Sequence, residues 1–365
     1  QSLATKESEL STLIKQAERF PSLISAPLFD YIKEPNAKLR LWDICDFVEL
    51  SLRLMVVIGL AQIRKDKEQL PETIVNEIRT RIEHPTLGKW LGMAQAIAKD
   101  HSVSQALKDT ISLFENELQG QGTKDEKTSL LSLRNYLAHG GSVSQLLSHQ
   151  LLAIWEPKFE KLISQLQLFT SLQIIARNHH QFKLLKGGIE ENHYYQPGSD
   201  EEVYALNHYL IDSYNVILKI ENEFFSVWPL FFYENSAEYL NPVQNIFVRR
   251  GELFLEYTPV GSPDLCQSQS NKEALDAFIT LFQLEDRRKK EEEKQYEVRG
   301  FETEFLADSK RFVGRENHLV EIKLALQTVS DRVFWITGNA GIGKSYLMSA
   351  TVMDLLENQD SFQLV

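Results

Sequence analysis

The stretch with the clearest chemical potential is Gly338-Asn339-Ala340-Gly341-Ile342-Gly343-Lys344-Ser345. It fits the pattern G-x-x-x-x-G-K-[ST], in which glycines let backbone N–H groups turn inward onto phosphate oxygens. In such a loop the lysine, here Lys344, neutralises phosphate charge, and the hydroxyl of Ser345 binds Mg²⁺. A β-rich run at 333–337 precedes the loop and a helical pattern at 346–357 follows it, an order that a chance glycine-rich turn would not explain. The sequence therefore predicts a site for ATP or another nucleoside triphosphate with Mg²⁺.

A second motif, Phe312-Val313-Gly314-Arg315-Glu316, stands upstream of this loop and leads into a helical pattern. Together the two motifs resemble the entrance of the STAND and AAA-type ATPases, in which a hydrophobic-Gly-Arg-Glu motif precedes the first strand. The resemblance covers residues 310–365 and implies an α/β P-loop fold, with Val313, Gly314 and Arg315 bordering the base. The Walker B strand of such ATPases has no counterpart before Val365, so we expect the sequence to be the front of a longer protein.

A third motif, Arg134-Asn135-Tyr136-Leu137-Ala138-His139-Gly140, lies in a helical region. It resembles the Arg-Asn-x-x-Ala-His-Gly form of the HEPN ribonucleases, whose domains are helical bundles. The Arg-to-His spacing alone is a weak signal, because Arg79 with His84 and Arg311 with His318 have similar separations. The residues around the third motif and the long helical region containing it favour the resemblance.

The residue types suit RNA cleavage without a metal ion. RNA supplies its own nucleophile, the 2′-OH, so the protein needs a group that moves protons and a cation that stabilises the phosphorane. Histidine titrates near neutral pH, and arginine offers a permanently charged fork to phosphate. The resemblance implies that His139 is the acid and base, that Arg134 binds the scissile phosphate and that Asn135 supports them.

Helix geometry leaves two ways to build this site. Residues five apart on a straight helix differ by roughly 140°, so Arg134 and His139 do not share a face. Either the helix ends near Gly140, or two chains form one composite cleft, as the resemblance to paired HEPN domains implies. Asp46 and Glu49 on a predicted central helix are candidates to orient Arg134, or else they are surface charges.

Composition places limits on the class of protein. The 365 residues are 43% hydrophobic and 25% charged, which is typical of globular proteins with two or three domains. No apolar run is long enough for a membrane span, and the two cysteines form neither a disulfide framework nor a zinc pattern, so we expect a cytoplasmic protein. The net charge of −12 argues against a broad nucleic-acid surface but is compatible with a small local RNA site.

Periodicity predicts the domain organisation. Apolar residues at helical spacing predict helices at 71–82, 86–99, 102–118, 124–139 and 143–168, around a buried central helix at 39–62, with Pro21 and Pro27 interrupting the first helical region. Short strands are predicted at 172–176, 182–185, 216–220, 230–233, 245–248 and 253–258, with a hairpin turn at Arg249-Arg250-Gly251-Glu252 between the last two and a helix at 201–213. Asn178-His179-His180 and His193 are interpreted as loop histidines rather than a metal site.

The predicted fold is therefore multidomain. An all-α, HEPN-like helical bundle spans 1–168 and a small α+β or β-rich module spans 169–264. A charged linker helix covers 265–300, beginning at Lys272, and the N-terminal part of a STAND or AAA-type α/β P-loop NTPase domain covers 301–365.

The function that these resemblances imply is a HEPN endoribonuclease controlled by an ATP-binding switch, as in bacterial antiviral defence or abortive infection. Its expected partners are an RNA substrate such as tRNA and a second copy of the chain, paired through the helical domain, with no membrane. The alternative is a signalling STAND ATPase whose helical domain only oligomerises or binds a partner protein.

Overall fold

The computed structural model describes residues 3–65, 67–119, 129–138, 144–178, 180–210, 212, 215–234, 243–251, 254–260, 268–269, 272–284, 317–322, 347, 350 and 351. The chain forms two compact units, Gln1–Arg288 and Lys289–Val365. In the second unit residues 317–322 are helical, as the pattern after Glu316 predicts. The P-loop fold predicted for this unit lies outside the described residues.

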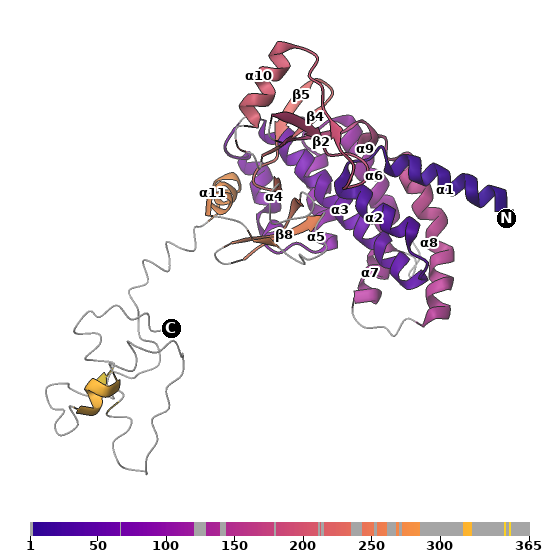
Figure 1. Ribbon diagram of the computed structural model, residues 1–365. Coiled ribbons are helices and arrows are strands. Elements are labelled where there is room, and N and C mark those ends of the chain that lie inside the picture. The colour runs from indigo at the N-terminus through magenta and orange to yellow at the C-terminus, as the bar shows by residue number, and fades with distance from the viewer. Residues whose placement is uncertain are drawn as a thin grey trace, which may run out of the picture. The chain divides into compact units, whose positions relative to one another are not determined.

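Helices make up the first part of the larger unit (Figure 1). In chain order they are α1 (Leu3–Ala17), α2 (Ser22–Lys33), α3 (Ala37–Arg64), α4 (Glu72–Ile82), α5 (Leu87–Ala98), α6 (Gln105–Gln119), α7 (Leu130–Ala138), α8 (Gln145–Gln165) and α9 (Gln167–Ser171). The helices predicted at 39–62, 71–82, 86–99 and 102–118 agree with α3 to α6 to within three residues at each end. The start predicted for the helix at 124–139 lies outside the described residues, and the helix predicted at 143–168 is divided into α8 and α9. One expectation was wrong: Pro27 lies inside α2, where it is buried, and only Pro21 marks a helix boundary.

Helix α3 is the central element of the unit. The Asn36 side chain begins it by accepting hydrogen bonds from the backbone N–H groups of Lys38 and Leu39, at 2.9 and 3.4 Å. Its 28 residues extend about 42 Å, and every residue from Leu50 to Ile63 is buried. A helix that is buried on all sides must be surrounded by other elements, which confirms the predicted central helix.

Gly59 allows helix α5 to approach α3 closely. A Cβ atom at Gly59 would lie 2.2 Å from Cγ2 of Ile97 on α5, so a larger residue at this position would push the two helices apart. Gly59 therefore fixes how closely α5 packs on α3.

Two antiparallel sheets follow the helices. Sheet 1 has the order β3-β2-β1-β4-β5 and sheet 2 the order β6-β7-β8-β9. The strands are β1 (Gln173–Asn178), β2 (Gln181–Leu184), β3 (His193–Tyr194), β4 (Val216–Ile220), β5 (Glu223–Ser226), β6 (Phe231–Glu234), β7 (Val243–Arg250), β8 (Leu255–Val260) and β9 (Ser268–Gln269). The predicted strands all occur, and β7 pairs with β8 as an antiparallel hairpin, but Arg249 and Arg250 belong to β7 and not to the turn. Sequence periodicity missed β3, β5 and β9; β3 and β9 have only two residues each, too few to show a period.

The two faces of sheet 1 pack against different partners. Alternate strand residues point to opposite faces, so Ile175 and Ile217 pack with Leu206 and Leu210 at the end of helix α10 (Asp200–Tyr209). The other face, which includes Ile174 and Leu218, joins the main core. Sheet 1 thus lies between α10 and the rest of the unit.

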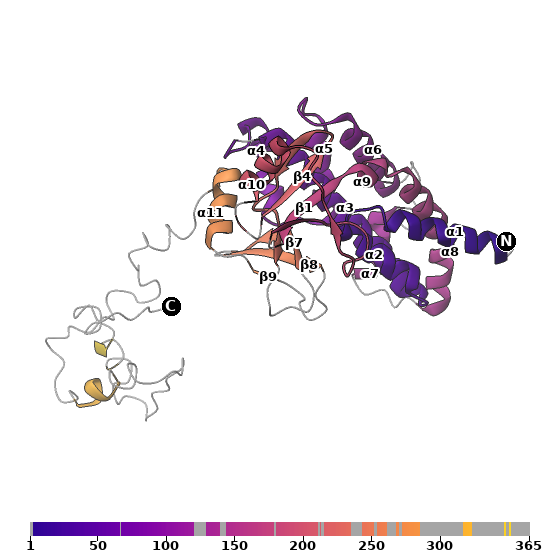
Figure 2. The same ribbon diagram turned by 45° about the horizontal axis from the view of Figure 1, so that its top comes forward.

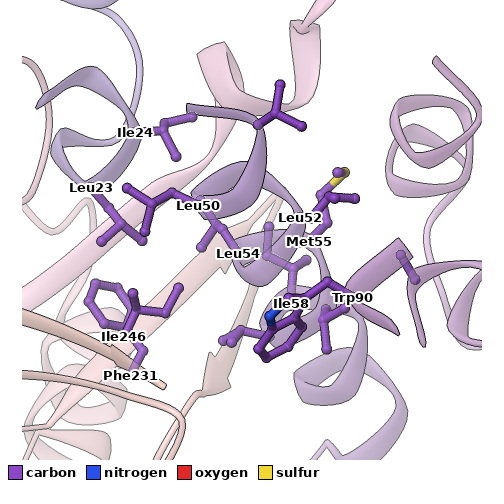
Figure 3. Close-up of a cluster of buried hydrophobic side chains, with 14 of the residues drawn as sticks. Leu23, Ile24, Leu50, Leu52, Leu54, Met55, Ile58, Trp90, Phe231 and Ile246 are labelled. Atoms are coloured by element: carbon purple, nitrogen blue, oxygen red, sulfur yellow. The ribbon is translucent and has the colours of Figure 1, made fainter. Parts of the chain in front are cut away.

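The helical and β regions share one hydrophobic core. Figure 3 shows side chains from α2 and α3 beside Trp90 of α5, Phe231 of β6 and Ile246 of β7. The core is therefore continuous across residue 168, where the sequence predicted a boundary between a helical bundle and a separate module. The domain boundaries stay predictions, but the two regions belong to one compact unit.

Helix α11 (Lys272–Leu281) begins where the linker helix was predicted to begin, but it is not a solvated linker. Phe278 contacts Phe247 of β7 with ring centroids 4.9 Å apart, and Leu275 and Phe282 are buried in the same core. Figure 2 shows α11 next to the strands of sheet 2. The first part of the predicted linker therefore packs on the larger unit, and its charged run from Glu285 onward lies outside the described residues.

A buried ion pair joins α4 to sheet 2. The Arg250 side chain is 2% exposed and donates to Oε1 of Glu83 at 2.8 Å, while its backbone N–H donates to the Glu83 carbonyl at 2.9 Å. The sequence suggested only a turn at Arg250.

None of the described helices is both long enough and apolar enough to cross a membrane.

Candidate functional site

The structure describes part of the predicted catalytic set. Arg134 is half-buried and Asn135 is exposed, both on α7, and the described helix ends at Ala138, one residue before His139. His139 itself lies outside the described residues, as do all of Gly338 to Ser345 and the three residues Val313, Gly314 and Arg315. The site can therefore be built only around Arg134 and Asn135.

Helix α7 is positioned by its own short apolar stripe. Ser129 begins the helix, because its hydroxyl accepts a hydrogen bond from the Ser132 N–H at 3.1 Å. Leu130, Leu133 and Leu137 are buried, and α7 packs on α3 and α6. Arg134 is adjacent to this stripe, so its guanidinium leaves the core beside α3, while Asn135 faces solvent.

The side of α3 near α7 contains three carboxylates that we call the acidic stripe: Asp43, Asp46 and Glu49. Their spacing of three residues places them along one side of the helix. The charge of Arg134 acts on Asp46, where it lowers the pKa of that carboxyl group. Asp46, one of the two carboxylates predicted to orient Arg134, thus lies within the electrostatic reach of that arginine.

Glu49 has a different partner. Its carboxylate accepts a hydrogen bond from Arg53, one turn further along α3. The other Nη of Arg53 donates to the Thr258 hydroxyl of β8 at 2.7 Å, and the guanidinium lies 5.9 Å from the ring centroid of Trp90. Glu49 and Arg53 therefore tie α3 to sheet 2.

The acidic stripe has more negative charge than its cations balance. The Asp46 side chain reaches solvent, yet the protein around it removes part of its hydration, and this loss together with repulsion from Glu49 raises the pKa of Asp46 to about 6 despite Arg53 and Arg134. Burial and repulsion from Asp30, Asp46 and Glu34 raise the pKa of Asp43 to about 7. At neutral pH the stripe thus favours any additional positive charge or proton.

Cys45 lies beneath the stripe but is not a chemical group of the site. It is 2% exposed, and burial first, with repulsion from Asp46 second, raises the pKa of its thiol well above the usual range. A protonated, buried thiol is unreactive.

The other Arg-His pair in the described residues has different surroundings. Arg79 on α4 is half-buried and donates to Oδ1 of Asn76 at 3.5 Å, while His84 is exposed after the helix and its carbonyl accepts from Nζ of Lys89 at 2.8 Å. Sequence spacing does not separate this pair from Arg134 and His139. The acidic stripe facing Arg134 does separate them.

A second polar cluster, not singled out from sequence, joins α10 to sheet 1; we call it the α10 clamp. Nζ of Lys219 on β4 donates to Oε1 of Glu202 at 2.6 Å and to the Tyr195 hydroxyl at 2.7 Å. Tyr195 and the backbone N–H of Gly198 also donate to Glu202. Burial alone would raise the pKa of Glu202, but these hydrogen bonds, first that from Lys219, lower it to about 2.

His193, one of the histidines that the sequence analysis interpreted as loop residues, lies on a strand and has a carboxylate partner. His193 on β3 pairs with Glu191, with Nε2 and Oε2 2.8 Å apart. In the part of the chain that the structure describes, no group of three or more His, Cys, Asp or Glu side chains has the geometry of a metal site. The predicted Mg²⁺ ligand, Ser345, lies outside that part.

Comparisons with known proteins add no family. No protein-family model matches the chain, and searches of curated proteins and of solved structures find no match. The functional argument therefore depends on the motifs and on the geometry around Arg134.

Proposed function

We propose that the chain is a metal-independent endoribonuclease of the HEPN type, controlled by ATP and Mg²⁺ binding at residues 338–345. The observation that best supports this is the position of Arg134, half-buried on α7 and within the electrostatic field of Asp46 on α3. Arg134 is thus partly shielded by the protein, lies near a carboxylate and still reaches solvent. A phosphate-binding arginine needs this access to solvent, and partial burial strengthens its interaction with phosphate.

The proposed reaction uses the RNA 2′-OH as the nucleophile. His139 removes the 2′-OH proton, the oxygen attacks the adjacent phosphorus, and the bond from phosphorus to the 5′-oxygen breaks as that oxygen gains a proton. Arg134 stabilises the extra negative charge on the phosphorane, and Asn135 hydrogen-bonds to the same nucleotide. The products are a 2′,3′-cyclic phosphate and a 5′-hydroxyl.

Asp46 is a positioning residue in this proposal. Its carboxylate attracts the guanidinium and reduces the number of positions that the long Arg134 side chain occupies before RNA binds. Because Asp46 also faces Glu49, its charge is poorly compensated, and the pairing with Arg134 is strongest when Asp46 is ionised, above pH 6.

Exposed apolar side chains near this helix support pairing of two chains. Tyr136 on α7 is 37% exposed, and on α8 Leu146 and Ile154 are 71% and 51% exposed. Figure 1 shows α7 and α8 at the same end of the larger unit. Large apolar side chains at the surface are typical of contacts with another chain, and a homodimer through these helices would bring two copies of Arg134 and His139 toward one cleft.

The decisive experiment is an RNA-cleavage assay on an oligomeric sample with total RNA or tRNA. Wild type is compared with Arg134→Ala, with His139→Ala and with the double variant Arg79→Ala/His84→Ala. The double variant is a matched control because it removes an Arg-His pair of the same spacing from α4. We expect both single variants to lose cleavage and the control to retain it.

The other outcomes point to the alternative function. Equal cleavage by all samples would exclude Arg134 and His139 from the active site. No cleavage by wild type, with or without ATP, would favour the regulatory ATPase whose helical domain only pairs with another protein.

The ATP switch has its own test. A Lys344→Ala variant should lose triggered cleavage, because Lys344 neutralises the bound phosphates, while the Arg134 site stays intact. Unchanged triggering would show that residues 338–345 are not the switch. A cytoplasmic role in antiviral defence or abortive infection is part of the same proposal and follows from the family resemblance.

A further inference from the structure

The larger unit contains an open cavity of about 780 Å³, remote from α7. It lies where the end of α3, the end of α10, strand β5 and helix α11 meet. Its walls include basic side chains at the end of α3 and just after it (Arg64, Lys65 and Lys67) and two aromatic side chains (Tyr209 and Trp228). No residue of the motifs found in the sequence takes part in it.

Arg64 gives the cavity a fixed wall. The guanidinium of Arg64 donates to the Trp228 carbonyl at 2.9 Å and to the Ser226 carbonyl at 3.4 Å. These bonds hold the segment after β5 against the end of α3. The Trp228 ring also contacts Phe232 edge-on, with centroids 6.0 Å apart. The indole is thereby preorganised, which reduces the entropy cost of binding a ligand.

The positive charge at the cavity is unusual for this chain. The protein has a net charge of −12, yet Arg64, Lys65 and Lys67 outnumber the two acidic side chains of the lining, Glu68 and Asp276. The Lys65 ammonium is 4.0 Å from Glu223, and both side chains are more than half exposed, so this ion pair is weak. Lys67 has no ion pair within the described residues. Both ammonium groups are thus available to an anion.

Two aromatic side chains add a stacking surface. Tyr209 and Trp228 both line the cavity and are partly exposed. Aromatic rings stack on nucleobases of any type, and lysine side chains bind phosphate as point charges. The volume lies within the range usual for small-molecule sites. We propose that this cavity binds a mononucleotide, with its base against Tyr209 or Trp228 and its phosphate at Lys65 and Lys67.

Helix α11 gives such a ligand a route to regulation. Asp276, Ala277 and Thr280 of α11 form one wall, and the helix is fastened by the Leu70 N–H, which donates to the Leu281 carbonyl at 3.2 Å. The chain runs from α11 toward the segment with the G-x-x-x-x-G-K-[ST] motif. A bound nucleotide would stabilise α11 in its docked position, at the start of that connection.

The test is isothermal titration calorimetry of the 365-residue chain with AMP, GMP, CMP and UMP. Every sample carries Lys344→Ala, so that binding at residues 338–345 is weakened. In this background, Lys65→Glu/Lys67→Glu is compared with the control Lys33→Glu/Lys38→Glu, which reverses two exposed lysines elsewhere. We expect a nucleotide to bind with a dissociation constant in the millimolar range or lower. The Lys65→Glu/Lys67→Glu variant should raise that constant at least about tenfold, and the control variant should not change it.

Three results would overturn the proposal. One is the absence of saturable binding for all four nucleotides. Another is equal affinity in the two double variants. The third is inorganic phosphate binding as tightly as the nucleotides, because that would leave the aromatic wall without a role. The proposal is independent of RNA cleavage, so a failed cleavage assay does not affect it.

Discussion

The acidic stripe on α3 and the α10 clamp belong to the same compact unit, but the neighbours of their carboxylates differ. In the clamp, Glu202 accepts hydrogen bonds from Lys219, Tyr195 and Gly198, and its pKa falls to about 2. In the stripe, carboxylates face each other, and the pKa values of Asp43 and Asp46 rise to about 7 and about 6.

The difference separates a structural tie from a candidate site. Both carboxylate oxygens of Glu202 accept hydrogen bonds from groups of the clamp, so its negative charge is compensated within the protein. The stripe keeps excess negative charge, and a nearby cation, Arg134 of α7, lies close to the helix end at which we propose that RNA is cleaved. Perturbed carboxylates of this kind are more frequent at functional sites.

The strongest way to sharpen the comparison is to remove one cation from each cluster. Arg134→Ala should reduce RNA cleavage by about 100-fold or more, because phosphorane charge would lose its main stabilising group. Lys219→Ala should leave cleavage per folded molecule unchanged. Initial rates with a labelled RNA, corrected for the folded fraction, measure both. If both variants lost cleavage to a similar extent, the distinction between a candidate active site near the stripe and a structural cluster in the clamp would be wrong.

The same Lys219→Ala variant should have the larger effect on stability. The substitution removes the two hydrogen bonds that Nζ donates and leaves the Glu202 carboxylate without its cation. We therefore expect a loss of about 2 kcal/mol in the free energy of unfolding. Urea denaturation monitored by circular dichroism is the measurement. Lys219→Ala combined with Glu202→Gln should recover part of the loss. A loss below a few tenths of a kcal/mol, typical of exposed ion pairs, would show that the clamp does not hold α10.

Asp46→Asn tests the positioning of Arg134. At pH 7.5 Asp46 is ionised, so its neutral replacement should lower cleavage roughly tenfold, equivalent to about 1.4 kcal/mol in the transition state. Below pH 6 the wild-type carboxyl group is itself protonated, so the difference between the two proteins should shrink. Rates measured from pH 5 to pH 8 give this ratio directly. A ratio that is constant with pH would remove Asp46 from the positioning role.

Asp43→Asn should reveal the repulsion within the stripe. Because the pKa of Asp43 is raised from 3.8 to about 7, its stabilising contribution is complete below pH 4 and is lost as the pH rises through 7. The free energy of unfolding of the asparagine variant should therefore equal that of wild type at pH 4. At pH 8 it should be larger by about 1 kcal/mol, a value that allows for solvent screening of the charges. Thermal melts across this range provide the test.

Glu202→Gln is the matched control for that pH series. The lowered pKa of Glu202 gives stability that is present above pH 4.5 and lost as the pH falls through 2, so this variant should be less stable than wild type at pH 7 and approach it in acid. The two variants should thus diverge from wild type in opposite directions at neutral pH. If both variants changed stability in the same direction at pH 7, the contrast between the stripe and the clamp would be wrong.

The sequence by itself determined the local elements and the motifs. The apolar residues of the segment that forms α3 predict a buried helix, and helical spacing from Lys272 onward predicts α11. Both predictions are possible because helix periodicity depends only on residues within a few turns. The G-x-x-x-x-G-K-[ST] motif at 338–345 is likewise recognised from local sequence, and the Arg134 motif from its spacing together with the residues around it. None of these required knowledge of the distant chain.

The tertiary structure decided which charged groups meet. It brings Arg134 within the electrostatic reach of Asp46 but puts Arg79 beside Asn76, and it pairs Arg250 with Glu83 across 167 positions of the chain. It also joins the helical and β regions in one core and brings four separate elements around the cavity at Trp228. Local spacing contains no information on such contacts, because they form only when packed helices and sheets bring remote residues together and remove them from water.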